Sequence, residues 1–253
     1  MLGRKRHDRQ SGERSAGGSR ILRHQPRKRG WEAATQADPA IREAIDAHLA
    51  DHLGEDMLVW HEIASDLVHV DVYMWSPTEA RPMYTFVTVG MSDRPMTVPR
   101  DLHGGGVSDR AELVVCLPPT WPVPPAGSGA TAPWDDPDAY FPIRWLKTLA
   151  RLPHEYRTWL GFGHTVPNGD PALPLAGTTQ LCGWVLLRPR TLPSSFGSVE
   201  LAGGGRIDVF GIVGLHQAEM DHKLAYGADS LLDGLLLARV SELLDIDRPS
   251  TKP

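Results

Sequence analysis

Three runs of strand-forming residues follow one another between residues 67 and 117, and no helix-forming segment separates them. Residues 67–75 alternate with a period of two, as a strand with two different faces does. One face is apolar (Val68, Val70, Val72 and Met74) and the other polar and aromatic (His69, Asp71, Tyr73 and Trp75). Residues 84–89 and 111–117 are β-branched and aromatic runs bounded by turn formers. Such closely spaced strands favour antiparallel pairing, with one buried and one polar-aromatic face at the first strand.

A helix is predicted immediately before these strands. Asp38 can cap its first turn, Pro39 suits the first helical position, and Gly54 can end it in a left-handed conformation. Four apolar residues recur at every fourth position and would form one buried face: Ile41, Ile45, Leu49 and Leu53.

The middle of the chain is interrupted by residues 118–142, which are dense in Pro, Gly, Ser and Ala and predict an irregular surface loop. Pro142 is then expected to open a helix with one apolar face, and Pro153 to stop or restart it. A nearly all-apolar strand is predicted at residues 181–187.

A glycine triplet at residues 203–205 separates two strand-like runs, which indicates a hairpin between residues 199–201 and 207–213. Helices are expected at residues 217–226, ended by Gly227, and at 228 to about 244. Strands before and after a central helix, with helices at both ends, indicate the α+β class. The expected fold is a mixed, mainly antiparallel sheet packed with helices.

Residues 1–36 are expected to be a disordered basic tail, and residues 37–247 a single domain. Residues 1–30 contain ten Lys or Arg and two acidic residues, which gives a local charge of +8. The whole chain has a net charge of −5, so residues 31–253, the acidic body, carry −13. The tail is poor in apolar residues and cannot repay the entropy of ordering. It lacks the apolar region of a secretory signal. Nucleic-acid binding through its arginines stays open, beside the simpler interpretation of a solvated extension.

Composition and motifs exclude several classes of protein. No apolar run approaches the roughly 18 to 20 residues that a membrane span needs, so no membrane association is expected. The only cysteines, Cys116 and Cys182, exclude a disulfide framework and a four-cysteine zinc site, and they fit a reducing, cytoplasmic compartment. Neither glycine triplet is followed by the Lys of a P-loop. No cofactor is predicted.

Two groups of titratable residues could carry chemistry. His69 and Asp71 would share a strand face and could ligate a metal, but a polar strand face explains them more simply, and no metal is predicted. His154, Glu155 and His164 lie near one another in the sequence and could form the acid–base pocket of an uncharacterised enzyme. No nucleophile or second carboxylate lies at a recognisable spacing, so no catalytic residue is assigned.

The most unusual segment is the loop at residues 161–171, which concentrates polar side chains, turn formers and two prolines between a helix and a strand. Loops held by rigid elements often carry binding groups. The side chains of Asn168 and Asp170 could equally close structural turns. Both interpretations remain open.

Several blocks of this sequence, in the same order, resemble the suppressor of fused family, in particular its short bacterial members. The resemblance spans about residues 55–237 and is carried by residues 60–63, 65–72, 84–96, 111–113, 117–119, 142–147, 152–156, 158–164, 167–171, 219–221, 223–224 and 227–229. It implies a mixed α/β, sandwich-like domain. In the animal relative this domain binds a transcription factor without catalysis and is followed by a second domain. The basic tail and the Pro- and Gly-rich residues 118–142 depart from the family pattern.

The resemblance also implies a role, because the short bacterial members are similar to immunity proteins that neutralise secreted polymorphic toxins by tight binding. We therefore expect a cytoplasmic, non-enzymatic binding protein whose acidic body suits a basic partner such as a nuclease toxin. A binding scaffold for a regulatory protein and an enzyme are the alternatives. The candidate partner-binding residues are those expected on polar faces or loops, with one aromatic anchor: Asp71, Tyr73, His154, Glu155, Trp159, His164, Asn168 and Asp170.

Overall fold

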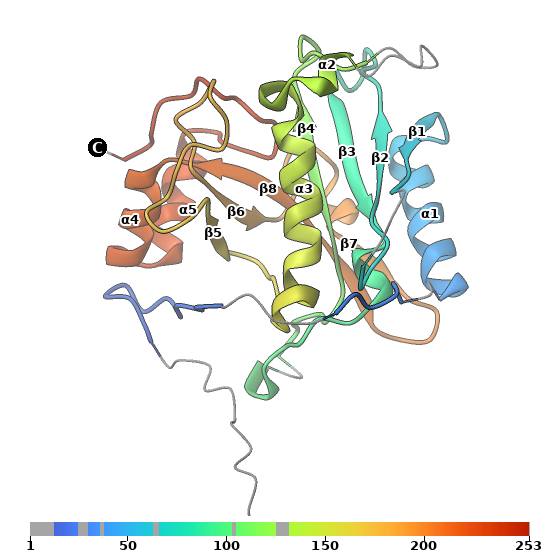
Figure 1. Ribbon diagram of the computed structural model, residues 1–253, viewed down its shortest axis with the longest axis horizontal. Coiled ribbons are helices and arrows are strands. Elements are labelled where there is room, and N and C mark those ends of the chain that lie inside the picture. Colours follow the sequence, from blue (N-terminus) through green and yellow to red (C-terminus); the bar gives the residue numbers. More distant parts are fainter. Residues whose placement is uncertain are drawn as a thin grey trace, which may run out of the picture.

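The computed structural model describes residues 13–24, 30–35, 38–62, 66–102, 105–124 and 132–252, and its centre is an eight-stranded mixed sheet (Figure 1). The strand order is β1-β2-β3-β4-β8-β6-β5, and β7 pairs with β8 off this path. Among the pairs of named strands in the described residues, only β4 and β8 are parallel. The predicted α+β class with a mixed, mainly antiparallel sheet is confirmed. The strands are β1 (Met57–Trp60), β2 (Asp71–Trp75), β3 (Tyr84–Val89), β4 (Ala111–Leu117), β5 (Thr165–Pro167), β6 (Gly183–Leu187), β7 (Ser198–Glu200) and β8 (Arg206–Leu215).

The first predicted strand is shorter than expected, and its polar-aromatic face is buried. β2 begins at Asp71 because Leu67 adopts a positive φ of 69°, and its backbone pairs with residues 32 and 35 instead of with the sheet. All five β2 residues are buried. The expectation of an exposed polar-aromatic face was wrong, because helix α1 (Pro39–Leu53) covers it.

Helix α1 matches its prediction residue for residue. The Asp38 side chain accepts a hydrogen bond from Ala40 N, and Gly54 follows the last turn with a φ of 89°. The four predicted apolar residues are buried against one face of the sheet. Trp75 Nε1 donates to Gly54 O at 2.8 Å, which joins the end of the helix to β2.

The opposite face of the sheet packs on helix α3 (Pro137–Tyr156), which lies in front of the sheet in Figure 1. The prediction that Pro142 opens this helix was wrong: Asp136 caps it, Pro137 takes the first position, and the short helix α2 (Ala132–Asp135) precedes it. Pro142 and Pro153 both lie inside α3, where burial of Pro142 beside Phe141 offsets a lost backbone hydrogen bond. Arg157 ends the helix in the left-handed region.

The last third of the chain adds the predicted β7–β8 hairpin and helices α4 (Gln217–Tyr226) and α5 (Ala228–Leu237). These helices cover a smaller apolar cluster on β6 and β8. The expected continuation of α5 to about residue 244 was wrong. Leu243 instead forms a parallel bridge with Cys116, and Leu244 N donates to Cys116 O, so this segment extends the edge of β4.

Short 3-10 helices complete the structure: η1 (Met91–Asp93), η2 (Arg100–Leu102) and η3 (Ser194–Gly197). In the described ranges, no helix is both long and apolar enough to cross a bilayer. The division into a tail at residues 1–36 and a domain at 37–247 stays a prediction. Much of that tail lies outside the described residues, and residues 13–24 and 30–35 make contacts with the body.

Candidate functional site

Two groups of the predicted residues come together in the structure, and the first surrounds Asp71 at the start of β2. The β1–β2 register pairs Trp60 with Val72, so its continuation sets His61 opposite Asp71. His61 Nδ1 lies 3.2 Å from Asp71 Oδ2, and His69 Nε2 lies 2.9 Å from Asp71 Oδ1. Glu62 N also donates to Asp71 Oδ1, at 3.2 Å. We call His61, His69 and Asp71 the Asp71 cluster.

Further charged side chains border the Asp71 cluster. Glu62 forms an ion pair with Arg151 of α3 and accepts a hydrogen bond from Val70 N at 3.3 Å. Asp93 of η1 is buried, and burial raises the pKa of its carboxyl group. Its Oδ1 atom has no hydrogen-bond partner in the part of the chain that the structure describes.

Tyr73, predicted on the same strand face as Asp71, is a buried contact with helix α1. Its hydroxyl lies 3.4 Å from Arg42 Nη1, and its ring centroid is 6.2 Å from that of Trp75. Burial raises the pKa of the Tyr73 hydroxyl. Tyr73 is 8% exposed and Asp71 is 5% exposed, so neither side chain presents an open surface to a partner.

His154 and Glu155 are neighbours in α3 but do not form an acid–base pair. His154 is buried, and its Nε2 atom donates to Met91 O at 3.0 Å, which attaches α3 to η1. Burial lowers the pKa of His154 to about 4. Glu155 is half-buried, and its charge acts on Arg151. The two side chains therefore have different partners.

The second group lies around His164, between β5 and helix α4. The His164 ring meets the Trp159 ring edge-on, with centroids 4.2 Å apart. Burial and the charge of Lys223 lower the pKa of His164 to about 4. Lys223 is itself buried; its Nζ atom donates to Gly163 O at 2.6 Å and to Thr165 Oγ1 at 3.1 Å. Burial lowers the pKa of Lys223 to about 8.

The two polar residues of the unusual loop have different roles. Asn168 Nδ2 donates to Leu173 O at 3.0 Å and to Pro174 O at 2.8 Å, so this side chain closes the loop. The Asp170 side chain is 88% exposed, and its Oδ2 atom lies 3.5 Å from Arg23 Nη1. Asp170 is thus the most accessible charged member of the predicted set.

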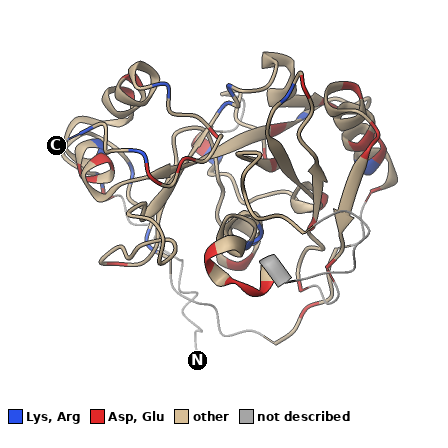
Figure 2. Ribbon diagram, turned by 90° about the horizontal axis from the view of Figure 1, so that it is seen from above, with Lys and Arg blue, Asp and Glu red and all other residues tan. Residues whose placement is uncertain are grey.

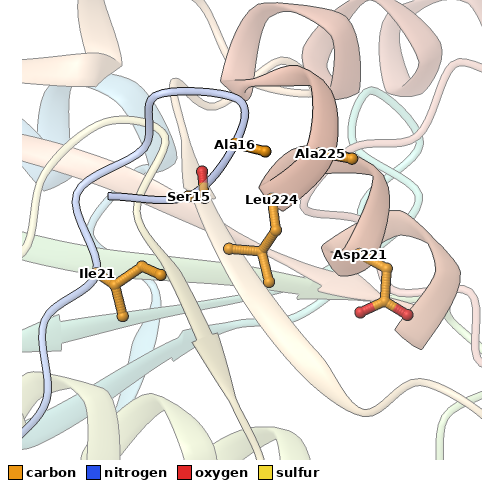
Figure 3. A pocket seen from close by; sticks show the side chains of 6 residues that line it. All are labelled: Ser15, Ala16, Ile21, Asp221, Leu224 and Ala225. Atoms are coloured by element: carbon orange, nitrogen blue, oxygen red, sulfur yellow. The ribbon is translucent and has the colours of Figure 1, made fainter. Parts of the chain in front are cut away.

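Residues 13–24, which we call the N-terminal segment, lie against this side of the domain. Gly17 N donates to Leu224 O at 2.8 Å, and a Cβ atom at Gly17 would lie 2.2 Å from Gly227 N. Arg20 pairs with Asp101 at 3.4 Å. A pocket lies between this segment and α4 (Figure 3), lined by Ser15, Ala16, Ile21, Asp221, Leu224 and Ala225.

The sequence pattern did not predict three residues that contact the candidate sites or the N-terminal segment: His61, Arg23 and Asp101. His61 joins Asp71 only across β1, a strand of four residues that the sequence pattern did not indicate. Arg23 and Asp101 meet their partners through contacts between distant segments. Figure 2 shows that acidic residues are spread over several helices and loops.

Comparison with known proteins gives matches to one family. The family model for the suppressor of fused protein (SUFU) matches residues 66–249. No match was found among curated proteins. The structure is similar to a SUFU homolog from Neisseria gonorrhoeae, with a TM-score of 0.59 and 15% identity over 83% of this chain and 96% of that one.

Two further solved structures share the fold. One is a Sufu–Fu complex, with a TM-score of 0.55 and 18% identity over 83% of this chain and 91% of that one. The other is Drosophila Suppressor of Fused, with a TM-score of 0.56 and 17% identity over 86% of this chain and 52% of that one. The chain thus matches about half of the Drosophila protein.

Proposed function

Since the chain belongs to the suppressor of fused family, we propose that it is a non-enzymatic protein-binding domain that neutralises a polymorphic toxin by direct binding. The similarity to a bacterial homolog and to a relative solved in a Sufu–Fu complex supports a binding role. The proposed partner is a basic protein toxin encoded nearby, and the proposed compartment is the cytoplasm. Both cysteines are free and buried, in keeping with a reducing environment.

One observation carries this proposal: the acidic body already binds a basic segment of the same chain, the N-terminal segment. Residues outside the first thirty carry −13, and the N-terminal segment belongs to the stretch that carries +8. Arg20 of that segment pairs with Asp101 of the body at 3.4 Å. Arg23 pairs with Glu13 of its own segment at 3.0 Å and also lies 3.5 Å from Asp170 of the body. A basic partner would meet the same exposed carboxylates, because complementary charge speeds encounter and helps to select a partner.

The environment of the predicted histidines supports binding over catalysis. His154 donates to a backbone carbonyl, and burial disfavours its charged form. His164 packs on Trp159 beside the Lys223 ammonium group. A general acid or base works best with a pKa near the working pH, and pKa values of about 4 lie well below neutrality.

The proposed contact surface retains the accessible members of the predicted set. Asp170 is exposed, and Glu155, Trp159, His164 and Asn168 are partly exposed. Asp71, Tyr73 and His154 would contribute indirectly, by holding β2, α1, α3 and η1 in place. The surface therefore combines a fixed loop, an aromatic group and exposed negative charge.

The direct test is calorimetric titration of the full chain with the product of the neighbouring open reading frame, together with a toxicity assay. We expect one-to-one binding that abolishes the toxicity of that product. A folded chain that does not bind would overturn the immunity role and favour a scaffold for another partner.

A charge reversal locates the surface. In Asp170→Lys, we expect slower association with the toxin and a weaker dependence of the association rate on salt. The matched control is Asp51→Lys on α1, whose side chain is 83% exposed against 88% for Asp170. Equal association rates for the two variants would place the contact elsewhere on the molecule.

A further inference from the structure

We propose that the Asp71 cluster is a zinc site, in which His61 Nδ1, His69 Nε2 and one Asp71 carboxylate oxygen bind the ion. These three ligand atoms all lie within 4.8 Å of one another. Ligand atoms around one tetrahedral Zn²⁺ ion are about 3.4 Å apart, given bond lengths near 2.0 to 2.2 Å. His61 Nδ1 lies 3.2 Å from Asp71 Oδ2 and His69 Nε2 lies 2.9 Å from Asp71 Oδ1, so each histidine nitrogen is close to that separation from a different oxygen of the carboxylate.

The donor set favours zinc over the hard cations. Two imidazoles and one carboxylate suit Zn²⁺ and related transition metals, whereas Ca²⁺ and Mg²⁺ prefer oxygen ligands throughout. Three protein ligands leave a fourth position, which we assign to water. His69 and Asp71 are two residues apart along the chain, and His61 comes from the adjacent strand end, so two segments fix the arrangement.

The surroundings provide support and access. Glu62 N donates to Asp71 Oδ1 and orients the carboxylate, as groups behind metal ligands commonly do. Asp93 is a nearby buried carboxyl group on which the charges of His69 and Asp71 act, and its Oδ1 atom has no hydrogen-bond partner in the described residues. Arg151 is paired with Glu62, while the charges of Arg42 and Lys147 also reach this region and oppose a cation. The His61 side chain is 73% exposed, so an ion can enter from solvent.

The site differs from the proposed toxin-binding surface and does not depend on it. Asp71 lies at the β1–β2 end of the sheet, whereas Asp170 follows β5 at the opposite end of the strand order. Zinc binding would hold the end of β1 against β2 at the sheet edge. Failure of the zinc site would therefore leave toxin binding through Asp170 as a separate question.

The test is titration of the metal-free full chain with ZnCl₂ by calorimetry, with Co²⁺ as a spectroscopic probe. We expect one Zn²⁺ per chain, and visible Co²⁺ ligand-field bands that differ from those of the hydrated ion. His61→Ala and His69→Ala should each weaken Zn²⁺ binding by at least about 100-fold, because loss of supporting groups alone costs 10- to 100-fold. The exposure of His61 makes His61→Ala compatible with the fold.

Two control variants decide where the ion sits. His222→Ala removes a histidine of α4 that pairs with Ser230, and it should leave Zn²⁺ affinity unchanged. His52→Ala tests a second pair of neighbouring histidines, in which the His48 and His52 ring centroids are 4.3 Å apart. Absence of binding, affinity unchanged in His61→Ala and His69→Ala, or loss only in His52→Ala would overturn the proposal.

Discussion

Two fully buried glutamates, Glu112 in β4 and Glu219 in α4, each hold a turn in place, but only one has a cationic partner. Glu112 Oε1 accepts hydrogen bonds from Gly90 N, Ser92 N and Ser92 Oγ, and Oε2 accepts one from Thr88 Oγ1. All four donors are neutral. Burial outweighs these bonds and raises the pKa of Glu112 to about 7.

Glu219 has the opposite balance. Burial alone would raise its pKa, but the Arg248 guanidinium group donates to both carboxylate oxygens at 2.7 and 2.6 Å, and Thr251 N and His216 N add further hydrogen bonds. The net effect is a lowered pKa. A buried glutamate therefore stays ionised when a cation pairs with it. When only neutral groups donate hydrogen bonds to it, burial raises its pKa and favours the protonated form.

Removal of the Arg248 guanidinium group should cause the largest loss of stability among these variants, because Glu219 then resembles Glu112 in having no cationic partner. Arg248→Met leaves Glu219 buried and unpaired, so we expect a loss of about 3–5 kcal/mol in the free energy of unfolding. Denaturant titration measures it. The double variant Arg248→Met/Glu219→Gln should recover part of the loss, and the control Arg190→Met at an exposed position should change stability by less than about 0.5 kcal/mol. A double variant no more stable than the single one would contradict the ion-pair interpretation.

The free energy of unfolding should depend on pH in opposite directions for the two glutamates. The folded pKa of Glu112, about 7, lies above its ordinary value of 4.5, so between these values the folded state holds the proton more tightly. Its contribution is therefore full below about pH 4.5 and is lost as the pH rises to about 7, up to about 3 kcal/mol. The lowered pKa of Glu219 gives the reverse trend, with stability lost on acidification.

The measurement is the difference in unfolding free energy between the wild type and Glu112→Gln across this pH range. The pKa of His154 is lowered from its ordinary value of 6.5 to about 4, so His154 also makes the protein less stable as the pH falls below 6.5. Because both proteins contain His154, its contribution cancels in the difference. A difference independent of pH would show that Glu112 keeps its ordinary pKa.

The same substitution at the two sites should have unequal costs. Glu219→Gln leaves the Arg248 guanidinium group, 9% exposed, without its counter-charge. Glu112→Gln keeps an amide oxygen for the neutral donors, so we expect a loss of about 1 kcal/mol. Glu219→Gln should therefore be at least about 2 kcal/mol more destabilising in denaturant titration at neutral pH. Equal losses would remove the distinction.

The smallest effect concerns a single donor. Ser92→Ala deletes the 2.7 Å hydrogen bond from Ser92 Oγ to Glu112 and leaves the backbone donors in place. We expect a loss of about 1 kcal/mol in thermal or denaturant unfolding. It should also raise the pKa of Glu112 further, because the hydroxyl favours the charged form. Ser230→Ala, which removes one hydroxyl contact to His222, is the control for a lost side-chain bond away from a buried charge.

Local patterns predicted the elements whose limits are set by local chemistry. Asp38, Pro39 and Gly54 fix both ends of α1 without help from the rest of the chain. The runs that became β3 and β4 were equally clear. The predicted start of α3 at Pro142 is wrong because a proline suits a first helical turn wherever it occurs, whereas Asp136 and Pro137 supply the actual start. Leu243 and Leu244 continue a helical spacing in the sequence, but pairing with Cys116, beyond the part of β4 that pairs with β8, decides their conformation.

The candidate sites depend on contacts that local patterns do not contain. His69 and Asp71 were placed on one face by their spacing, but His61 needed the β1–β2 register to join them. The burial of Tyr73 depends on α1 packing over β2, a tertiary contact. Partner-binding residues have no required spacing, so the roles of Glu155, Trp159 and Asp170 stay predictions.

The position of β8 in the sheet has a consequence for the growing polypeptide. β8 lies between β4 and β6, and its parallel pairing joins Ala111 to Asp208, almost one hundred positions later in the chain. While the protein is being synthesised, the first four strands leave the ribosome with the edge of β4 unpaired. An unpaired edge strand is a site for aggregation, so the nascent chain needs protection until residues 206–215 emerge. An interior strand of the finished sheet is thus the last of its strands to be made.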